Sequence, residues 1–176
     1  EFVSIDKIKT ESLYNLFSAC VKYGQIKKFY GILNEYKKYI SSDDLSFFVK
    51  KINQNFGSNE NLYSTILRIS SAVFSNSGSG KDEEVLKLFY PRNFYDFVKF
   101  YANEYNLSES LLFSLIRTES YFDKNVFSRV GATGLTQLMP ETASKDIARK
   151  LRVQNFDLLD PQTNINFGAF YLSNMI

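Results

Sequence analysis

The feature that most constrains the fold is the spacing of the apolar residues, which recur every three or four positions. In the first part of the chain, one such series spans residues 26–40 and another spans residues 62–73. This period corresponds to one face of an α-helix, and strand-like alternation is absent. Gly24, the Ser-Asp cluster at 41–44 and the polar segment at 57–59 separate the series. We therefore predict an all-α chain whose N-terminal region forms helical hairpins in an α-solenoid-like arrangement.

A short polar segment at residues 75–80, Ser-Asn-Ser-Gly-Ser-Gly, is the best candidate for a linker. It is small, polar and rich in glycine, and apolar periodicity resumes after it. We predict a helical-hairpin N-terminal region at residues 1–78 and a second helical domain at residues 79–176. The hydrophobic content of 44% is sufficient for a real core.

The residues available for chemistry are restricted, because the chain has no histidine and a single cysteine, Cys20. An intrachain disulfide, a zinc or other soft-metal site and a histidine-dependent nucleophilic triad are thereby excluded. Carboxylates become the leading candidates for catalysis, and no cofactor is expected. The 21 basic and 19 acidic residues form no basic block, so nucleic acid is not an expected partner.

No apolar run approaches the roughly 18 residues that span a bilayer. The first residues also lack the basic and then apolar profile of a signal peptide. We therefore expect a mature form, a piece of a longer protein or a cytosolic protein.

One predicted helix carries a carboxylate among its apolar positions. It starts after the N-cap candidate Ser108, and Leu112, Leu115, Ile116 and Glu119 then follow at i, i+3, i+4 and i+7. This pattern predicts that Glu119 lies on the buried stripe, where a carboxylic acid could serve as a general acid. The alternative is that the side chain only ends the helix in solvent, or pairs with a basic neighbour, Arg117 or Lys124.

The loop after this helix contains the segment GATGLTQLMPETA at residues 131–143. Its two glycines permit tight turns, and Pro140 suits the first turn of a helix. Gln137 lies between apolar neighbours, where an amide is more often part of a hydrogen-bonding pocket than of a core. Further on, Asp160 and Pro161 predict the start of another helix, in which Gly168 would allow close packing.

Taken together, these residues resemble the soluble lytic transglycosylases over roughly residues 88–176. The matching positions are Glu119-Ser120, Phe122, Ser128, Gly131-Ala132, Gly134-Leu135, Gln137-Leu138-Met139-Pro140, Thr142-Ala143, Asp160-Pro161, Asn164-Ile165, Gly168 and Tyr171-Leu172. The N-terminal region is compatible with the superhelical domain of larger members by architecture only. Lys124, Val126 and Thr136 depart from residues that are usual in the family, and we interpret them as tolerable changes in loops and lining.

The resemblance implies a lysozyme-like α-helical domain that cleaves the MurNAc-GlcNAc β-1,4 bond of peptidoglycan and leaves a 1,6-anhydro-MurNAc end. It implies that Glu119 is the general acid and then the base, and that Ser128, Gln137 and Met139 line the sugar subsites. It also implies a location in the periplasm or cell envelope, with peptidoglycan strands as the partner. Envelope proteins are a further possible partner for the N-terminal helices.

The nearest other carboxylates, Asp123, Glu141 and Asp146, do not match a catalytic position, and we expect them to be solvated. The family also continues into an Ala-Tyr-Asn-Ala-Gly-like segment that has no match here, so we expect the domain to be incomplete at its C-terminal end. Three other readings stay open: a non-catalytic peptidoglycan-binding module, a helical interaction scaffold, and a hydrolase resembling goose-type lysozyme.

Overall fold

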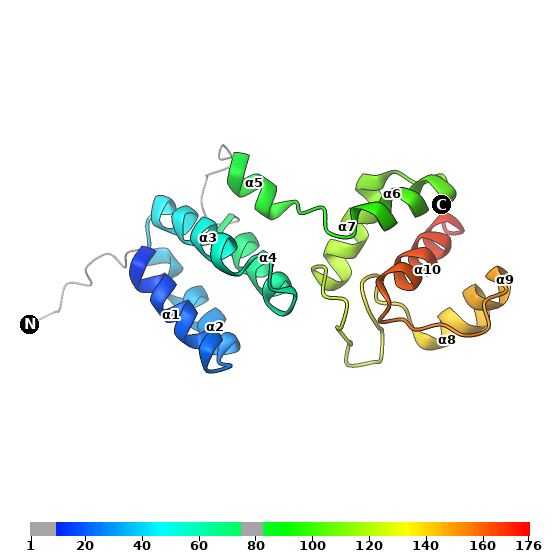
Figure 1. Cartoon of the computed structure of the whole chain (residues 1–176), viewed down its shortest axis with the longest axis horizontal. Helices are drawn as coiled ribbons and strands as arrows, with labels where there is room; N and C mark the ends of the chain where they lie inside the picture. Colours follow the sequence, from blue (N-terminus) through cyan, green and yellow to red (C-terminus); the bar gives the residue numbers. More distant parts are fainter. Residues whose placement is uncertain (1–9, 75–82) are drawn as a thin grey trace, which may run out of the picture. The chain divides into compact units, whose positions relative to one another are not determined.

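The computed structural model describes residues 10–74 and 83–176, and the regular structure in these two stretches is helical (Figure 1). The predicted all-α class is confirmed. Within these residues the exceptions are isolated bridges of Thr133 with Phe127 and with Leu138. No helix of the described residues is long and apolar enough to cross a membrane.

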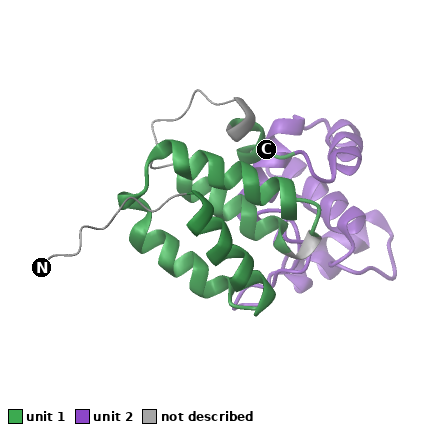
Figure 2. Cartoon of the chain, turned by 60° about the vertical axis from the view of Figure 1, so that its left-hand side comes forward, with its two compact units in different colours: residues 1–91 green, residues 92–176 purple. Residues whose placement is uncertain are grey.

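Two compact units make up the chain, residues 1–91 and residues 92–176 (Figure 2). The linker predicted at residues 75–80 lies outside the described residues, and the predicted boundary near residue 78 stays a prediction. The helices of the first unit are α1 (Thr10–Lys22), α2 (Ile26–Tyr36), a 3-10 turn (Lys37–Tyr39), α3 (Ser42–Phe56), α4 (Glu60–Phe74) and α5 (Glu83–Phe89).

The first unit is a set of antiparallel hairpins around an aromatic core. Phe17, Phe29 and Phe48 are fully buried, and the ring of Phe17 meets those of Phe29 and Phe48 edge-on at 5.1 and 6.1 Å. Ser41 begins α3, since its hydroxyl accepts a hydrogen bond from the backbone N–H of Asp44 at 3.1 Å. The helix predicted at residues 62–73 is confirmed as α4, and the one predicted at residues 26–40 is confirmed as α2 as far as Tyr36, after which the 3-10 turn follows.

The second unit contains α6 (Tyr95–Glu104), α7 (Glu109–Ser120), α8 (Pro140–Thr142), a π-helical segment (Ala143–Ala148), α9 (Arg149–Leu151) and α10 (Pro161–Ser173). Helix α6 packs against both α7 and α10, and α10 also packs against the π-helical segment. The core beside α10 includes Leu138, Ile147 and Phe167, which are at most 5% exposed. This core fixes the end of the 121–139 loop against α10.

The starts predicted for the helices of this unit are confirmed by their caps. The Ser108 hydroxyl accepts from the N–H of Leu111 at 3.2 Å, and the Asp160 carboxylate accepts from the N–H of Thr163 at 2.8 Å. Pro140 and Pro161 both stand in the first turn of their helices.

Candidate active site

Glu119 lies in the last turn of α7, immediately before the chain reverses. Tyr121 ends the helix in the left-handed conformation, with φ of 52°, and its N–H bonds to the carbonyl oxygen of Arg117 at 3.1 Å. Phe122 follows with φ of 61° and is buried. The reversal carries the chain away from α7 into the loop of residues 121–139.

The prediction that Glu119 lies on the buried stripe of α7 is wrong, because its side chain is exposed. The buried line consists of Leu112, Ile116 and Ser120, each 0% exposed, at i, i+4 and i+8. Steps of four residues advance about 40° around a helix, so this line slants across α7 and passes beside Glu119. Leu115, one turn earlier, is half-buried on the same flank as Glu119.

The loop after α7 is pinned by a glycine that no other residue could replace without strain. Gly134 has φ of +76°, and a Cβ built on it would lie 2.3 Å from Nδ2 of Asn164 and 2.4 Å from the carbonyl oxygen of Leu158. Its N–H bonds to the carbonyl oxygen of Val126 at 3.0 Å. The predicted tight turn is therefore confirmed at this position.

Asn164 of α10 ties this loop to the rest of the unit. The side chain is fully buried, and Oδ1 accepts from the N–H and the hydroxyl of Thr136, each at 2.7 Å. Nδ2 donates to the carbonyl oxygens of Thr133 at 3.0 Å and Leu158 at 2.8 Å. All four bonding positions of the amide are used, so one side chain fixes two loops at once.

Gln137 takes a left-handed backbone conformation, with φ of 48°. Its Nε2 donates to the carbonyl oxygens of Gly134 at 2.9 Å and Val126 at 3.3 Å. A non-glycine residue holds such a conformation where surrounding contacts enforce it, and such positions cluster at functional sites. Since both bonds use Nε2, the amide oxygen Oε1 is the end of this half-buried side chain that remains for a ligand.

Helix α7, the loop and α10 together enclose a cavity of about 300 Å³. Its lining residues are Leu115, Glu119, Thr136, Gln137, Leu138, Met139, Thr142, Gly168, Tyr171, Leu172 and Met175. The structure thus brings together three of the four predicted site residues, Glu119, Gln137 and Met139. The volume is at the lower end of the range for small-molecule sites.

Among the described residues that line the cavity, Glu119 alone carries a carboxylate. No hydrogen bond or ion pair joins that carboxylate to another residue in the described part of the chain, which excludes pairing with Arg117 or Lys124 there. The carboxylate of Glu141 bonds to Lys145, and that of Asp123 accepts from the N–H of Asn125 at 3.0 Å. Neither lines the cavity.

Ser128 does not line the cavity. Its hydroxyl accepts from the N–H groups of Ala132 at 2.9 Å and Val130 at 3.3 Å, and so closes a turn on the far part of the loop. In this structure the side chain supports the loop that carries Gln137.

Several lining residues were not predicted. Tyr171 lies on α10 and Met175 lies four residues further on, just past the end of that helix, while Thr136 was interpreted only as a tolerable change. The i, i+4 spacing of Tyr171 and Met175 was a signal, but it does not say which partner their shared face meets. In residues 10–74 and 83–176, no group of three or more His, Cys, Asp or Glu side chains is placed to hold a metal ion.

Two solved structures with the same fold are those of lytic transglycosylases. An inactive mutant of lytic transglycosylase Slt from Pseudomonas aeruginosa superposes with a TM-score of 0.65 and 24% identity, covering 94% of this chain and 25% of that chain. The 70-kDa soluble lytic transglycosylase of Escherichia coli gives a TM-score of 0.60 at 22% identity, covering 97% of this chain and 27% of that chain. The predicted fold is confirmed by these matches.

Sequence comparison gives the same family. The soluble lytic murein transglycosylase of Escherichia coli K12 is 35% identical over 98 residues, which are 53% of this chain and 15% of the relative. Membrane-bound lytic murein transglycosylase C of Actinobacillus succinogenes is 33% identical over 85 residues, 46% of this chain and 24% of the relative. The chain therefore spans a minor part of the length of these relatives. Residues 96–176 match the family model of the transglycosylase SLT domain, and this part of the chain belongs to that family.

Proposed function

We propose that this protein cleaves the β-1,4 bond between MurNAc and GlcNAc in peptidoglycan and forms a 1,6-anhydro-MurNAc end. The observation that carries the proposal is the cavity between α7, the loop and α10, where Glu119 is the sole carboxylate among the described lining residues. Membership of the transglycosylase SLT domain family supports the substrate class. The names of the curated relatives, lytic murein transglycosylases, support the reaction.

The proposed reaction uses the Glu119 carboxyl group twice. As an acid it gives its proton to the glycosidic oxygen while the bond between that oxygen and C1 breaks. The carbonyl oxygen of the substrate's own acetamido group stabilises the positive charge at C1. The resulting carboxylate then takes the proton of the MurNAc 6-hydroxyl as that oxygen bonds to C1, which restores the acid and forms the anhydro ring.

The absence of a second carboxylate from the described lining residues supports a mechanism of this kind. Glycosidases usually place two carboxylates across the bond, about 6.5–9.5 Å apart in inverting enzymes and about 5–5.5 Å apart in retaining enzymes. Here the acetamido group of the substrate takes the place of the second carboxylate.

The remaining lining residues suit an amino sugar. Oε1 of Gln137 can accept a hydrogen bond from a hydroxyl or an N–H of the sugar, and the 40% exposed side chain of Met139 offers an apolar surface to a ring face. A direct sugar contact by Ser128 stays a prediction. We also propose action in the periplasm or cell envelope, where peptidoglycan lies, and possible envelope partners for the first unit.

Hydrolysis is the second candidate, because the exposed Glu119 side chain leaves water free to compete with the 6-hydroxyl. The two reactions share the acid and differ only in the acceptor. They are distinguished by the sugar end that remains after cleavage.

The test is digestion of purified peptidoglycan by the wild type, Glu119→Gln and Glu104→Gln, followed by mass spectrometry of the sugar ends. Glu104 is an exposed glutamate at the end of α6 and does not line the cavity, so it is a matched control. We expect anhydro ends from the wild type and the control. Since a general acid contributes about 10²–10⁴ to rate, Glu119→Gln should lose at least about 100-fold.

Reducing ends from the wild type would assign hydrolysis instead. If neither the wild type nor Glu119→Gln released cleaved sugar ends but both still bound peptidoglycan, the protein would be a non-catalytic binding module. Equal activity of the wild type and Glu119→Gln would remove Glu119 from the mechanism.

A further inference from the structure

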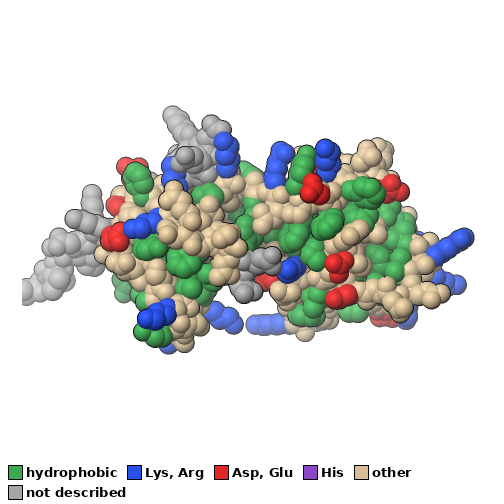
Figure 3. All heavy atoms as spheres, in the orientation of Figure 1, with side chains coloured by type: hydrophobic (Ala, Val, Ile, Leu, Met, Phe, Trp, Pro, Cys, Tyr) green, Lys and Arg blue, Asp and Glu red, His purple; other side chains and the backbone are tan. Residues whose placement is uncertain are grey.

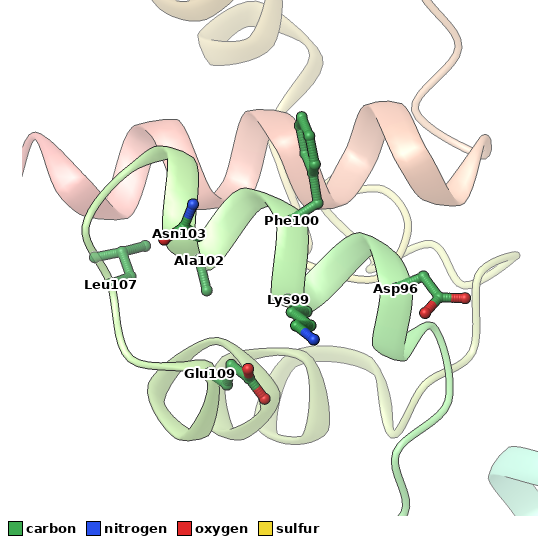
Figure 4. A pocket seen from close by; sticks show the side chains of 7 residues that line it. All are labelled: Asp96, Lys99, Phe100, Ala102, Asn103, Leu107 and Glu109. Carbon is green, nitrogen blue, oxygen red and sulfur yellow. The ribbon is translucent and has the colours of Figure 1, made fainter.

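A second hollow lies in the same unit, on the outer side of α6 and the start of α7 (Figure 4). Its volume is about 520 Å³, and its lining residues are Asp96, Lys99, Phe100, Ala102, Asn103, Leu107 and Glu109. We call it the α6–α7 groove. It shares no lining residue with the cavity that contains Glu119.

The polar side chains of the groove are accessible and unpaired among themselves. Asp96, Lys99 and Asn103 follow one another on the exposed face of α6, and Glu109 is the first residue of α7. In the described part of the chain no ion pair joins Asp96, Lys99 or Glu109 to another residue. The groove thus offers two carboxylates as acceptors, an ammonium group as a donor, and an amide that does both.

An aromatic ring stands at the rim of the groove. Phe100 is 62% exposed and meets the ring of Tyr101 edge-on, with centroids 5.0 Å apart and planes at 88°. Tyr101 is itself held, since its hydroxyl accepts from Nε2 of Gln162 on α10 at 3.2 Å. Phe100 is therefore supported by a ring that is itself held in place, while Ala102 and Leu107 add apolar atoms to the lining.

This mixture of groups restricts the chemistry of a ligand. Two carboxylates beside one ammonium disfavour a polyanion. On the face of this unit that Figure 3 shows, acidic and basic side chains stand among hydrophobic ones and do not gather by sign. A neutral ligand rich in hydroxyl and amide groups would satisfy both the acceptors and the donors, and its C–H face would stack on Phe100.

We propose that the α6–α7 groove is a second carbohydrate site, which binds a segment of N-acetylated glycan. In this proposal the acetamido methyl group packs on the apolar lining from Ala102 and Leu107, and the hydroxyls meet Asp96, Asn103 and Glu109. The volume suits a small-molecule site. The choice of an N-acetylated glycan rests on the proposed function.

Such a site would change how the protein handles a polymer. A strand held at both the groove and the Glu119 cavity gains from the effective concentration that two linked contacts create. The groove would therefore slow release of long strands without taking part in bond cleavage.

The direct test is an NMR titration of ¹⁵N-labelled protein with tri-N-acetylchitotriose, in a Glu119→Gln background so that no turnover occurs. We expect shifts at the backbone amides of residues 96–109 that saturate with the sugar. Removing one aromatic contact is worth about 3- to 10-fold in affinity, so Phe100→Ala should weaken this binding by that factor. The matched control is Phe47→Ala. Phe47 is likewise 62% exposed, but it lies on α3 in the first unit and does not line the groove.

The proposal is overturned if the sugar leaves the 96–109 amides unmoved, or if Phe100→Ala and Phe47→Ala bind it equally. Shifts produced by a lysine-containing peptide and not by chitotriose would make the groove a peptide site, which also overturns it. A failure of the proposed function has a different readout. In that case the wild type would be inactive towards peptidoglycan, whether or not the sugar shifts the amides of the groove. Phe100 is largely exposed, so the substitution should leave the fold intact, and an unchanged thermal midpoint checks this.

Discussion

Replacing Asn164 by alanine tests whether one buried amide holds the second unit together around the cavity. In the wild type, Asn164 is 0% exposed and bonds to Thr136, Thr133 and Leu158 through four contacts of 2.7–3.0 Å. Without it, the hydroxyl of Thr136 keeps its bond to the backbone carbonyl of residue 164 at 3.2 Å, and the carbonyl of Thr133 keeps the N–H of Leu138.

Two buried backbone groups then lose their partner, the N–H of Thr136 and the carbonyl oxygen of Leu158. An orphaned buried polar group costs about 1–3 kcal/mol, so Asn164→Ala should lower the free energy of unfolding by about 2–6 kcal/mol. For a domain of this size each kcal/mol lowers Tm by about 4–8 °C, and the expected fall is therefore at least about 8 °C.

The measurement is thermal and urea unfolding followed by circular dichroism, with Asn174→Ala as the control. Asn174 is an exposed asparagine at the end of the same helix, and its side chain makes one bond, to the carbonyl oxygen of Phe170 at 2.6 Å. The control should stay within about 0.5 kcal/mol of the wild type. If Asn164→Ala loses no more stability than Asn174→Ala, Asn164 does not hold the loop and the reasoning is refuted.

Two more substitutions probe the packing of α10 and the ionisation of a half-buried phenol. Gly168→Ala should lower the free energy of unfolding by about 1–3 kcal/mol, because the new Cβ would lie 2.5 Å from two atoms of the Thr136 side chain. In the control, Gly31→Ala on α2, the new Cβ meets no atom within 4 Å, so this variant should not be destabilised. Equal midpoints of urea unfolding for the two variants would contradict the expectation. Burial is the main cause that raises the pKa of Tyr105 in the folded protein. The neutral phenol therefore contributes to the free energy of unfolding below about pH 10, and this contribution is lost as the pH rises through the folded-state pKa. Tyr105→Phe should therefore show a smaller fall in Tm between about pH 8 and about pH 11 than the wild type, and an equal fall would refute the assignment.

The sequence predicted those features that local interactions decide. Ser108 and Asp160 were recognised as N-caps because each bonds to an N–H only three residues away. Gly168 was expected to allow close packing, but its partner, the side chain of Thr136, is 32 positions away and was not identified. The helical class and the starts of α7 and α10 therefore followed from the sequence, whereas the 3-10 turn and the π-helical segment were not predicted.

Features that depend on contacts between distant residues could not be predicted from the sequence. The apolar spacing of α7 fitted two slightly different buried lines, and only packing against α6 and the loop decided in favour of the one through Ser120 instead of Glu119. The lining role of Tyr171 and Met175 likewise depends on what α10 faces. Ser128 could be assigned to the loop, but its bonds within the turn became visible only in the structure.

The two sides of the cavity are positioned by different means. This difference explains why some features of the site could be predicted from the sequence and others could not. Glu119 is carried by a helix whose buried line, Leu112 to Ser120, lies in the core of the unit, and this helix packs against α6. Gln137 is carried by a loop that reaches its place through bonds to Asn164, a residue 27 positions further along the chain. The resemblance of the residues around it, and not the apolar spacing of α7, singled out Glu119, whereas the cavity beside it depends on the contacts of Asn164. It follows that Asn164→Ala should displace Gln137, and with it the sugar contacts proposed for this residue, at temperatures where α7 still holds Glu119 in place.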